Sequence, residues 1–303
     1  MKRIKTVSVI LIFTLSMCVS AQALAKDQTE GIHTKDKNSY SDQWADEYVS
    51  GIVFNKCVTQ EDIDRIATME NLRSLSIEVS GSDIDLSPLV NLTQLQELSI
   101  LFLTGADDVD LTFLKDMRYL TKIYFNKCTA LKDLSLFENK IFLKDLSVGY
   151  VEDVDLNYLA GCKSLESVSI KGENIRNAEG LSELTHLHHL GLHETQPERD
   201  PQKEPTMQDL YQLSKLTGLE SVELRSVHVE DISPLAQLPN LQWIRLVGTG
   251  VDDIESLNQL ERLETLEIYG NESKRVKEQE EKYFSDIERV YITEELPNIL
   301  LNY

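Results

Sequence analysis

A short apolar pattern, L-x-x-L-x-L with Val, Ile or Phe replacing some leucines, recurs along most of this chain. Nine copies register cleanly, and their first positions are Leu72, Leu95, Leu120, Leu143, Leu165, Leu187, Leu219, Leu241 and Leu263. Successive copies begin 22 to 25 residues apart, except for one step of 32 residues after Leu187. Weaker copies at Val49 and Ile287 mark the two ends. A fixed period of this size indicates a repeat architecture, in which each unit contacts mainly its neighbours.

Each copy describes one short strand followed by a return segment with apolar positions of its own, as in "VEDISPLAQLPNLQWIRL" (229–246). Alternate strand residues point to opposite faces, and one unit cannot bury its apolar face alone, so neighbouring units must stack. This pattern and period define a leucine-rich repeat. We therefore predict an α/β fold, a single leucine-rich repeat solenoid over residues 49–292. It has a parallel β-sheet on its concave face, about nine clear repeats and two end caps.

Two repeats carry a family resemblance. "DLSPLVNLTQLQELSI" (85–100) and "DISPLAQLPNLQWIRL" (231–246) resemble the 22-residue repeats of the internalin-like proteins that bacteria export. The resemblance covers about residues 49–292 and implies the solenoid fold, whereas the partner of such a protein depends on its variable positions. "LPNILLNY" (296–303) carries no cell-wall sorting motif, so we do not expect anchoring of the internalin kind.

The amino end has the features of a secretory signal peptide: a basic start, an apolar run over residues 7–19, and Ala23-Leu24-Ala25 before a polar stretch. We predict cleavage after Ala25 and a secreted, extracellular protein. The alternative is a lipoprotein with its lipid on Cys18 in "LSMC", although the preceding Met17 is larger than the residue usual in such motifs.

Both ends of the solenoid carry capping signals. Residues 26–48 are predicted to form a flexible segment and an N-terminal cap, in which Trp44 and Tyr48 cover the open core. "TQEDIDRIATM" from Thr59 has a helix-capping pattern. Residues 271–292 predict a charged helix and a final strand, and residues 293–303 a C-terminal tail.

The charge balance excludes some partners. The chain has a formal charge of −21, and removal of residues 1–25 leaves 27 Lys and Arg against 51 Asp and Glu, or −24. Such a field repels phosphate backbones and anionic lipids, so we expect neither nucleic-acid nor membrane-surface binding. Beyond the signal peptide no stretch approaches the roughly 20 apolar residues that span a bilayer. The sequence leaves the oligomeric state open.

Three cysteines remain after cleavage. Cys57 and Cys128 each follow a strand in the motif "FNKC", and Cys162 aligns with the inward Leu238. We expect thiols that fill core positions. Cys57 and Cys128 lie three repeats apart, and with about 4.8 Å between strands this exceeds the reach of a disulfide.

Four of the six histidines fall within "THLHHLGLHE" (185–194). The register turns His189 and His193 outward, about 13 Å apart along one strand. A zinc site needs each nitrogen about 2 Å from the ion. We therefore favour solvated or partner-contacting histidines. The alternative is a metal held by both rings leaning over Gly191, with Glu223 as a further ligand.

The outward positions change character along the chain. The first repeats present small and polar residues, whereas the later ones present a set enriched in Trp, Tyr and Arg: His189, His193, Glu223, Arg225, Trp243, Arg245, Tyr269, Arg289 and Tyr291. Such residues commonly anchor protein interfaces. The alternative is a structural one, a cross-strand charge ladder of Glu223, Arg245 and Glu267 with Trp243 resting over it.

Two further features have competing explanations. Acidic turns such as "VEDVDL" and "VDDIESL" could bind calcium, but aspartates at repeat turns commonly cap backbone N–H groups, which we favour. The proline-rich insertion "TQPERDPQKEPT" (195–206) could border a binding site or be a tolerated insertion.

We found no phosphate-binding loop, no H-E-x-x-H, no C-x-x-C and no nucleophile elbow, and we predict neither enzymatic activity nor a cofactor. The predicted function is a secreted protein-binding module whose partner occupies the C-terminal half of the concave face. The alternatives are a structural or cell-envelope protein without a dedicated ligand site, and an enzyme that uses the histidines and Glu223.

Overall fold

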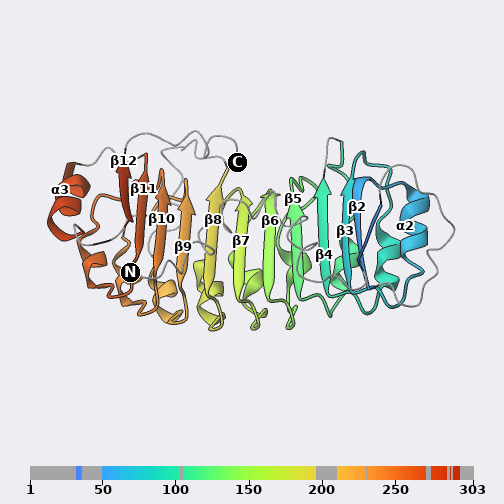
Figure 1. Cartoon of the computed structure of the whole chain (residues 1–303), viewed down its shortest axis with the longest axis horizontal. Coiled ribbons are helices and arrows are strands. Elements are labelled where there is room, and N and C mark those ends of the chain that lie inside the picture. Colours follow the sequence, from blue (N-terminus) through green and yellow to red (C-terminus); the bar gives the residue numbers. More distant parts are fainter. Residues whose placement is uncertain are drawn as a thin grey trace, which may run out of the picture. The chain divides into compact units, whose positions relative to one another are not determined.

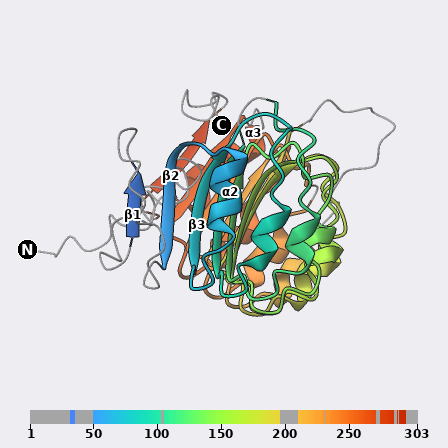
Figure 2. The same cartoon turned by 90° about the vertical axis from the view of Figure 1, so that its right-hand side faces the viewer.

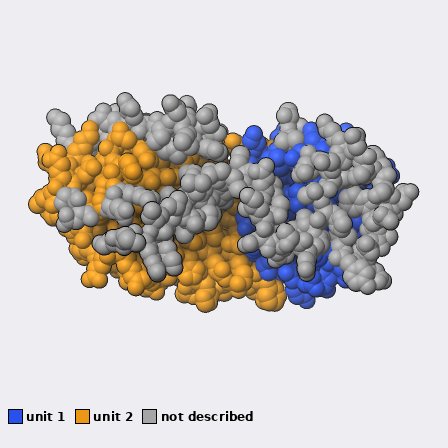
Figure 3. Space-filling model, viewed as in Figure 1, with its two compact units in different colours: residues 1–128 blue, residues 129–303 orange. Residues whose placement is uncertain are grey.

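The structure is a computed structural model that describes residues 32–35, 50–102, 105–195, 210–229, 231–270, 274–284, 287 and 289–293. The chain divides into two compact units, the N-terminal unit (residues 1–128) and the C-terminal unit (residues 129–303), coloured separately in Figure 3. The predicted signal peptide, Cys18, Trp44, Tyr48 and residues 196–206 lie outside the described residues. One continuous solenoid over residues 49–292 stays a prediction.

The N-terminal unit is a parallel sheet whose strands pair in chain order. The strands are β1 (Ile32–Lys35), β2 (Gly51–Cys57), β3 (Ser74–Val79), β4 (Glu97–Phe102) and β5 (Lys122–Asn126). The return segments contain α2 (Gln60–Ile66) and the 3₁₀ helices η1 (Ser87–Asn91) and η2 (Thr112–Lys115). Figure 2 shows α2 on the side of the sheet to which these segments return.

The C-terminal unit repeats this architecture (Figure 1). Its parallel strands are β6 (Asp145–Val151), β7 (Ser167–Gly172), β8 (His189–Glu194), β9 (Ser221–Arg225), β10 (Trp243–Val247), β11 (Thr265–Tyr269) and β12 (Arg289–Thr293). The return segments contain η3 (Ser135–Phe137), η4 (Leu156–Leu159), η5 (Ala178–Glu183), η6 (Tyr211–Lys215), η7 (Ser233–Gln237) and η8 (Glu255–Gln259). The helix α3 (Lys274–Tyr283) comes between β11 and β12.

The core lies between each sheet and its return segments. All three apolar positions of each of the nine repeat copies are buried, which confirms the predicted register and the leucine-rich repeat fold. At the last strand, Val290 and Ile292 are only half-buried. The return segments are short 3₁₀ turns because a repeat of about 22 residues leaves little chain for a longer helix.

Aspartates hold the turns between strands and return segments. In six repeats an Asp side chain accepts a hydrogen bond of 2.8 to 3.0 Å from the backbone N–H two residues later, at Asp85, Asp110, Asp133, Asp155, Asp231 and Asp253. This confirms the predicted capping role. Within the described ranges, no three His, Cys, Asp or Glu residues are grouped so that they could hold a metal ion.

The predicted helix from Thr59, the predicted charged helix and the predicted final strand are confirmed, whereas the predicted cap of Trp44 and Tyr48 lies outside the described residues. Thr59 begins α2 with a capping box, in which its hydroxyl accepts from the Asp62 N–H and the Asp62 carboxylate accepts from the Thr59 N–H. The predicted charged helix is α3, and the predicted final strand is β12. The sequence did not predict β1, which pairs its backbone with β2 within the segment expected to be flexible.

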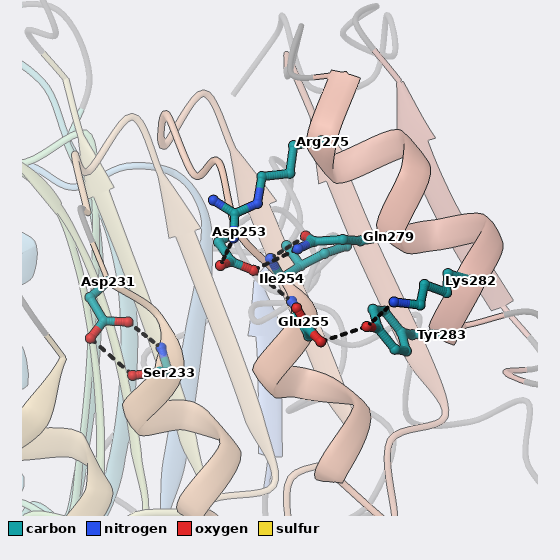
Figure 4. A network of polar contacts seen from close by, with 9 residues as sticks. All are labelled: Asp231, Ser233, Asp253, Ile254, Glu255, Arg275, Gln279, Lys282 and Tyr283. Carbon is teal, nitrogen blue, oxygen red and sulfur yellow. Dashed lines mark hydrogen bonds and ion pairs between the residues drawn. The ribbon is translucent and has the colours of Figure 1, made fainter.

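A polar network ties α3 to the preceding repeat (Figure 4). Gln279 is buried, and its side-chain carbonyl accepts a hydrogen bond of 2.8 Å from the Ile254 N–H while its amide donates to Asp253 at 2.8 Å. Arg275 also pairs with Asp253, at 2.5 Å. One glutamine therefore satisfies both a backbone donor and the turn aspartate, so α3 is held in place at η8.

The prediction for the cysteines is right at two positions and wrong at one. Cys128 and Cys162 are buried, and the Cys162 Sγ donates to the Phe137 carbonyl oxygen at 3.1 Å. Burial raises the pKa of the Cys162 thiol. Cys57 is exposed, because the register of β2 shifts after Val53 and β1 ends opposite Phe54. The last residues of β2, including Cys57, therefore extend beyond the end of its neighbour β1.

Candidate binding surface

The register of the C-terminal unit brings the predicted site residues onto one face of adjacent strands, which we call the outer face because it points away from the core. Strand pairing arranges the outer face in three rows. The first contains Ser167, His189, Ser221, Trp243 and Thr265; the second contains Ser169, Gly191, Glu223, Arg245, Glu267 and Tyr291; and the third contains Lys171, His193, Arg225, Val247 and Tyr269.

Glu223, Arg245 and Glu267 form the charge ladder that the sequence offered as its structural alternative. The Arg245 Nε donates to Glu267 Oε2 at 2.6 Å, and its Nη1 lies 3.6 Å from Glu223 Oε1. Glu223 also accepts from the Arg225 Nε at 2.7 Å. Burial acts to lower the pKa of Arg245, but its hydrogen bond to Glu267 and the charge of Glu223 raise that pKa overall. Arg245 therefore stays cationic, and it is paired with both glutamates of the ladder.

Trp243 lies against this ladder. The Arg245 guanidinium carbon stands 4.7 Å from the centroid of the indole ring, a cation–π contact. An outward strand position would leave the ring exposed if nothing covered it, but Trp243 is half-buried, and Arg245 and Glu267 are buried. Part of the reason is that the guanidinium of the same strand covers the indole.

The two outward histidines of β8 have separate environments. The His189 Nδ1 is hydrogen-bonded to the Ser221 hydroxyl at 2.8 Å, and burial lowers the pKa of the ring. His193 lies between Lys171 and Arg225 in the third row. Burial, followed by the charges of these two neighbours, lowers the pKa of His193 to about 4, so its ring is neutral at pH 7.

Lys171 also lies on this surface, although the outward set identified from the sequence did not include it. Its side chain is buried, and its Nζ lies 4.6 Å from the centroid of the Tyr150 ring and 3.4 Å from the Tyr150 hydroxyl. Tyr150 adopts a left-handed backbone conformation (φ 66°) where the register of β6 shifts. The repeat pattern gives no signal for such a bulge, so this contact could not be predicted from it.

The tyrosines of the last two strands complete the surface. Tyr291 is 52% exposed and lies beside Glu267, whereas Tyr269 is half-buried. Burial and the charge of Glu267 raise the pKa of Tyr269, so its hydroxyl stays protonated at neutral pH. The outer face thus offers aromatic area, hydroxyl donors and cations.

Comparisons with known proteins show similarity of structure. An internalin (inlF) from Listeria monocytogenes str. 4b F2365 matches with a TM-score of 0.58 and 22% identity, over 78% of this chain and 76% of that protein. The plant peptide hormone receptor RGFR1, in complex with RGF2, matches with a TM-score of 0.54 and 13% identity, over 84% of this chain and 46% of the receptor. No family model and no curated protein matches. At these identities the similarity shows the fold, that of the leucine-rich repeat proteins.

None of the helices in the described ranges is long and apolar enough to cross a bilayer.

Proposed function

We propose that this chain is a protein-binding module whose partner occupies the outer face of the C-terminal unit. The observation that carries the proposal is the stacked Trp243 and Arg245, held by the charge ladder, with Tyr269 and Tyr291 on the next two strands. Side chains fixed before binding lose little conformational freedom when a partner arrives. Trp, Tyr and Arg are also the residues that contribute most at interfaces.

The fold supports this proposal. A solenoid presents an extended strand face that repeat proteins commonly use to bind partners. The plant receptor that shares the fold is in complex with RGF2, so a chain of this architecture can hold a ligand. We place no residue of the proposed surface by that likeness, because the identity is only 13%.

The proposal includes export. A mature protein beginning at Lys26 would carry its partner site outside the cytoplasm, as the sequence of residues 1–25 suggests. Mass spectrometry of the exported fraction tests this. A chain that begins at a lipid-modified Cys18 would instead support the lipoprotein alternative.

A structural or cell-envelope role is the second candidate, favoured by the internal pairing of the charge ladder. Arg225 and Arg245 already have carboxylate partners, and the ladder residues Arg245 and Glu267 are buried without any ligand. Such a face could simply stabilise the sheet. The two candidates differ in the consequence of removing the indole of Trp243.

The test uses a partner isolated with residues 26–303 as bait and then purified. We expect Trp243→Ala to weaken its binding by at least about 2 kcal/mol in a titration, with a smaller effect on the melting temperature than Leu246→Ala. That core change should cost roughly 2 to 5 kcal/mol of unfolding free energy.

Tyr124→Ala is the matched control, because it removes a half-buried aromatic ring from β5 in the N-terminal unit. Unchanged affinity for Trp243→Ala, or a loss equal to that of the control, would favour the structural role.

A further inference from the structure

Three basic side chains stand in register on consecutive strands of the outer face. Lys171 on β7 pairs with His193 on β8, which pairs with Arg225 on β9. Since neighbouring strands are about 4.8 Å apart, the three Cα atoms lie within about 10 Å. We call Lys171, His193 and Arg225 the cationic row. It lies on a chain with a formal charge of −21.

The charges of this surface do not balance. Arg225 and Arg245 are paired with Glu223 and Glu267. Lys171 is only 8% exposed, and its polar contact is the Tyr150 hydroxyl at 3.4 Å. No carboxylate pairs with its ammonium group among the described residues. A buried ammonium group without a counter-charge is energetically unfavourable. An anion bound beside Lys171 would supply that counter-charge.

Arg245, a second cation of the outer face, also has a side-chain nitrogen without a hydrogen-bond acceptor among the described residues. The Nη1 of Arg245 is buried and makes no hydrogen bond within the described part of the chain, since its distance to Glu223 Oε1 is 3.6 Å. Buried donors normally have a hydrogen-bond acceptor. This observation is independent of Lys171 and indicates that the surface has more donors than its own acceptors satisfy.

The residues beside the cationic row in the second row of the outer face are small. Ser169 and Gly191 occupy neighbouring positions in the second row, next to Lys171 and His193 along their strands. A Cβ atom placed on Gly191 would lie 3.5 Å from the Ser169 Oγ, an ordinary contact distance. Ser169 and Gly191 therefore place no large side chain beside Lys171 and His193.

We propose that the cationic row binds the carboxylate of an acidic side chain in the partner protein, seated over Ser169 and Gly191. This inference rests on the proposed function and adds the chemistry of the partner. The carboxylate would pair with Lys171 and accept hydrogen bonds from His193 and Arg225. Charge-assisted hydrogen bonds of this kind are among the stronger polar contacts in proteins.

Binding of a carboxylate is coupled to protonation of His193. In the free protein, burial together with Lys171 on β7 and Arg225 on β9 lowers the pKa of His193 to about 4, while Glu194 and His189 are the other titratable groups of β8. A bound negative charge opposes these effects and raises the pKa of the ring. Affinity for the carboxylate therefore increases as the pH falls from 7 toward 5.

The experiment uses a fluorescent decapeptide of alternating Glu and Thr, and the same peptide with Gln in place of Glu. In fluorescence anisotropy on residues 26–303, we expect the Glu peptide to bind below roughly 1 mM and the Gln peptide at least tenfold more weakly. Lys171→Gln and Arg225→Gln should each weaken binding at least about fivefold. NMR of the His193 ring should show its pKa rising when the Glu peptide is added.

Lys215→Gln is the control, because it removes the same charge from an exposed position on η6 and should change affinity less than about twofold. Thermal melts of all variants check folding, and Lys171→Gln should melt no lower than the parent. Equal binding of the two peptides, no binding of either, or an equal effect of Lys215→Gln would overturn the proposal.

Two further measurements distinguish a failure of the carboxylate proposal from a failure of the proposed function. If inorganic phosphate raises the pKa of His193 as much as the Glu peptide does, the row is a site for free anions and the proposal is wrong. If Trp243→Ala weakens binding of the purified partner whereas Lys171→Gln does not, the proposed function stands and the acidic contact fails. If Lys171→Gln weakens binding of the purified partner whereas Trp243→Ala does not, the proposal for the cationic row is supported and the proposed site around Trp243 is wrong.

Discussion

Replacing His193 with Gln should make the protein less sensitive to acid. The pKa of His193 is about 4 in the folded protein, against 6.5 for the free side chain, because burial and the charges of Lys171 and Arg225 disfavour the protonated ring. Below pH 6.5 the unfolded chain binds a proton at this position and the folded chain does not. The neutral ring thus contributes stability that is present above pH 6.5 and is lost as the pH falls toward 4.

The size of the effect follows from the two pKa values. Each pKa unit corresponds to about 1.4 kcal/mol, so the interval from 6.5 to about 4 amounts to about 3.5 kcal/mol. The ring is half-buried, and solvent screening reduces this to about 2 to 3 kcal/mol. Between pH 7 and pH 4, the parent protein should therefore lose about 2 to 3 kcal/mol more unfolding free energy than His193→Gln does.

Urea unfolding followed by circular dichroism, at pH 7, 6, 5 and 4, measures this difference. Carboxylate protonation also destabilises the fold in acid, but it affects the parent and the variant alike and cancels in the comparison. His186→Gln, which changes an exposed histidine in the preceding turn, is the matched control. A stability gap between parent and His193→Gln that stays constant from pH 7 to pH 4 would refute the reasoning.

Three further substitutions test the packing. Arg245→Met should lower the unfolding free energy by roughly 3 to 5 kcal/mol, because it leaves the two glutamates of the charge ladder without their shared cation. Gln279→Ala should cost about 1 to 3 kcal/mol, since the buried Ile254 N–H loses its acceptor. Thr59→Ala should cost about 1 kcal/mol through loss of the α2 cap. Urea unfolding at pH 7 measures all three.

Each of these has a matched control. Arg176→Met removes a more exposed arginine that pairs with Asp153, and should cost at most about 1 kcal/mol. If Arg245→Met costs no more than Arg176→Met, the ladder contributes little to stability. Gln279→Glu keeps an acceptor for the Ile254 N–H but adds a charge beside Asp253. Thr59→Ser retains the capping hydroxyl, so a loss as large as that of Thr59→Ala would rule out the cap as the cause.

The apolar core and the turn chemistry followed from the sequence alone. The buried positions of the nine copies, the capping aspartates and the helices α2 and α3 all match the pattern. The physical reason is that each repeat is a local unit in which strand alternation fixes which residues point inward. Stacking of like units then brings equivalent residues side by side, which is why the ladder of Glu223, Arg245 and Glu267 could be anticipated.

What the outward side chains do once they are side by side was decided by the tertiary structure. The pattern gave no reason to expect that Lys171 is buried against Tyr150 or that β1 pairs with β2. It also misjudged Cys57, which a register shift leaves exposed. The repeat pattern specifies only the face of the sheet to which a side chain points. The exposure of that side chain depends on bulges, on its rotamer and on which neighbouring side chain covers it. For the same reason the sequence identified the residues of the candidate surface, but the surplus charge of the cationic row could be recognised only from the contacts of Lys171 in the fold.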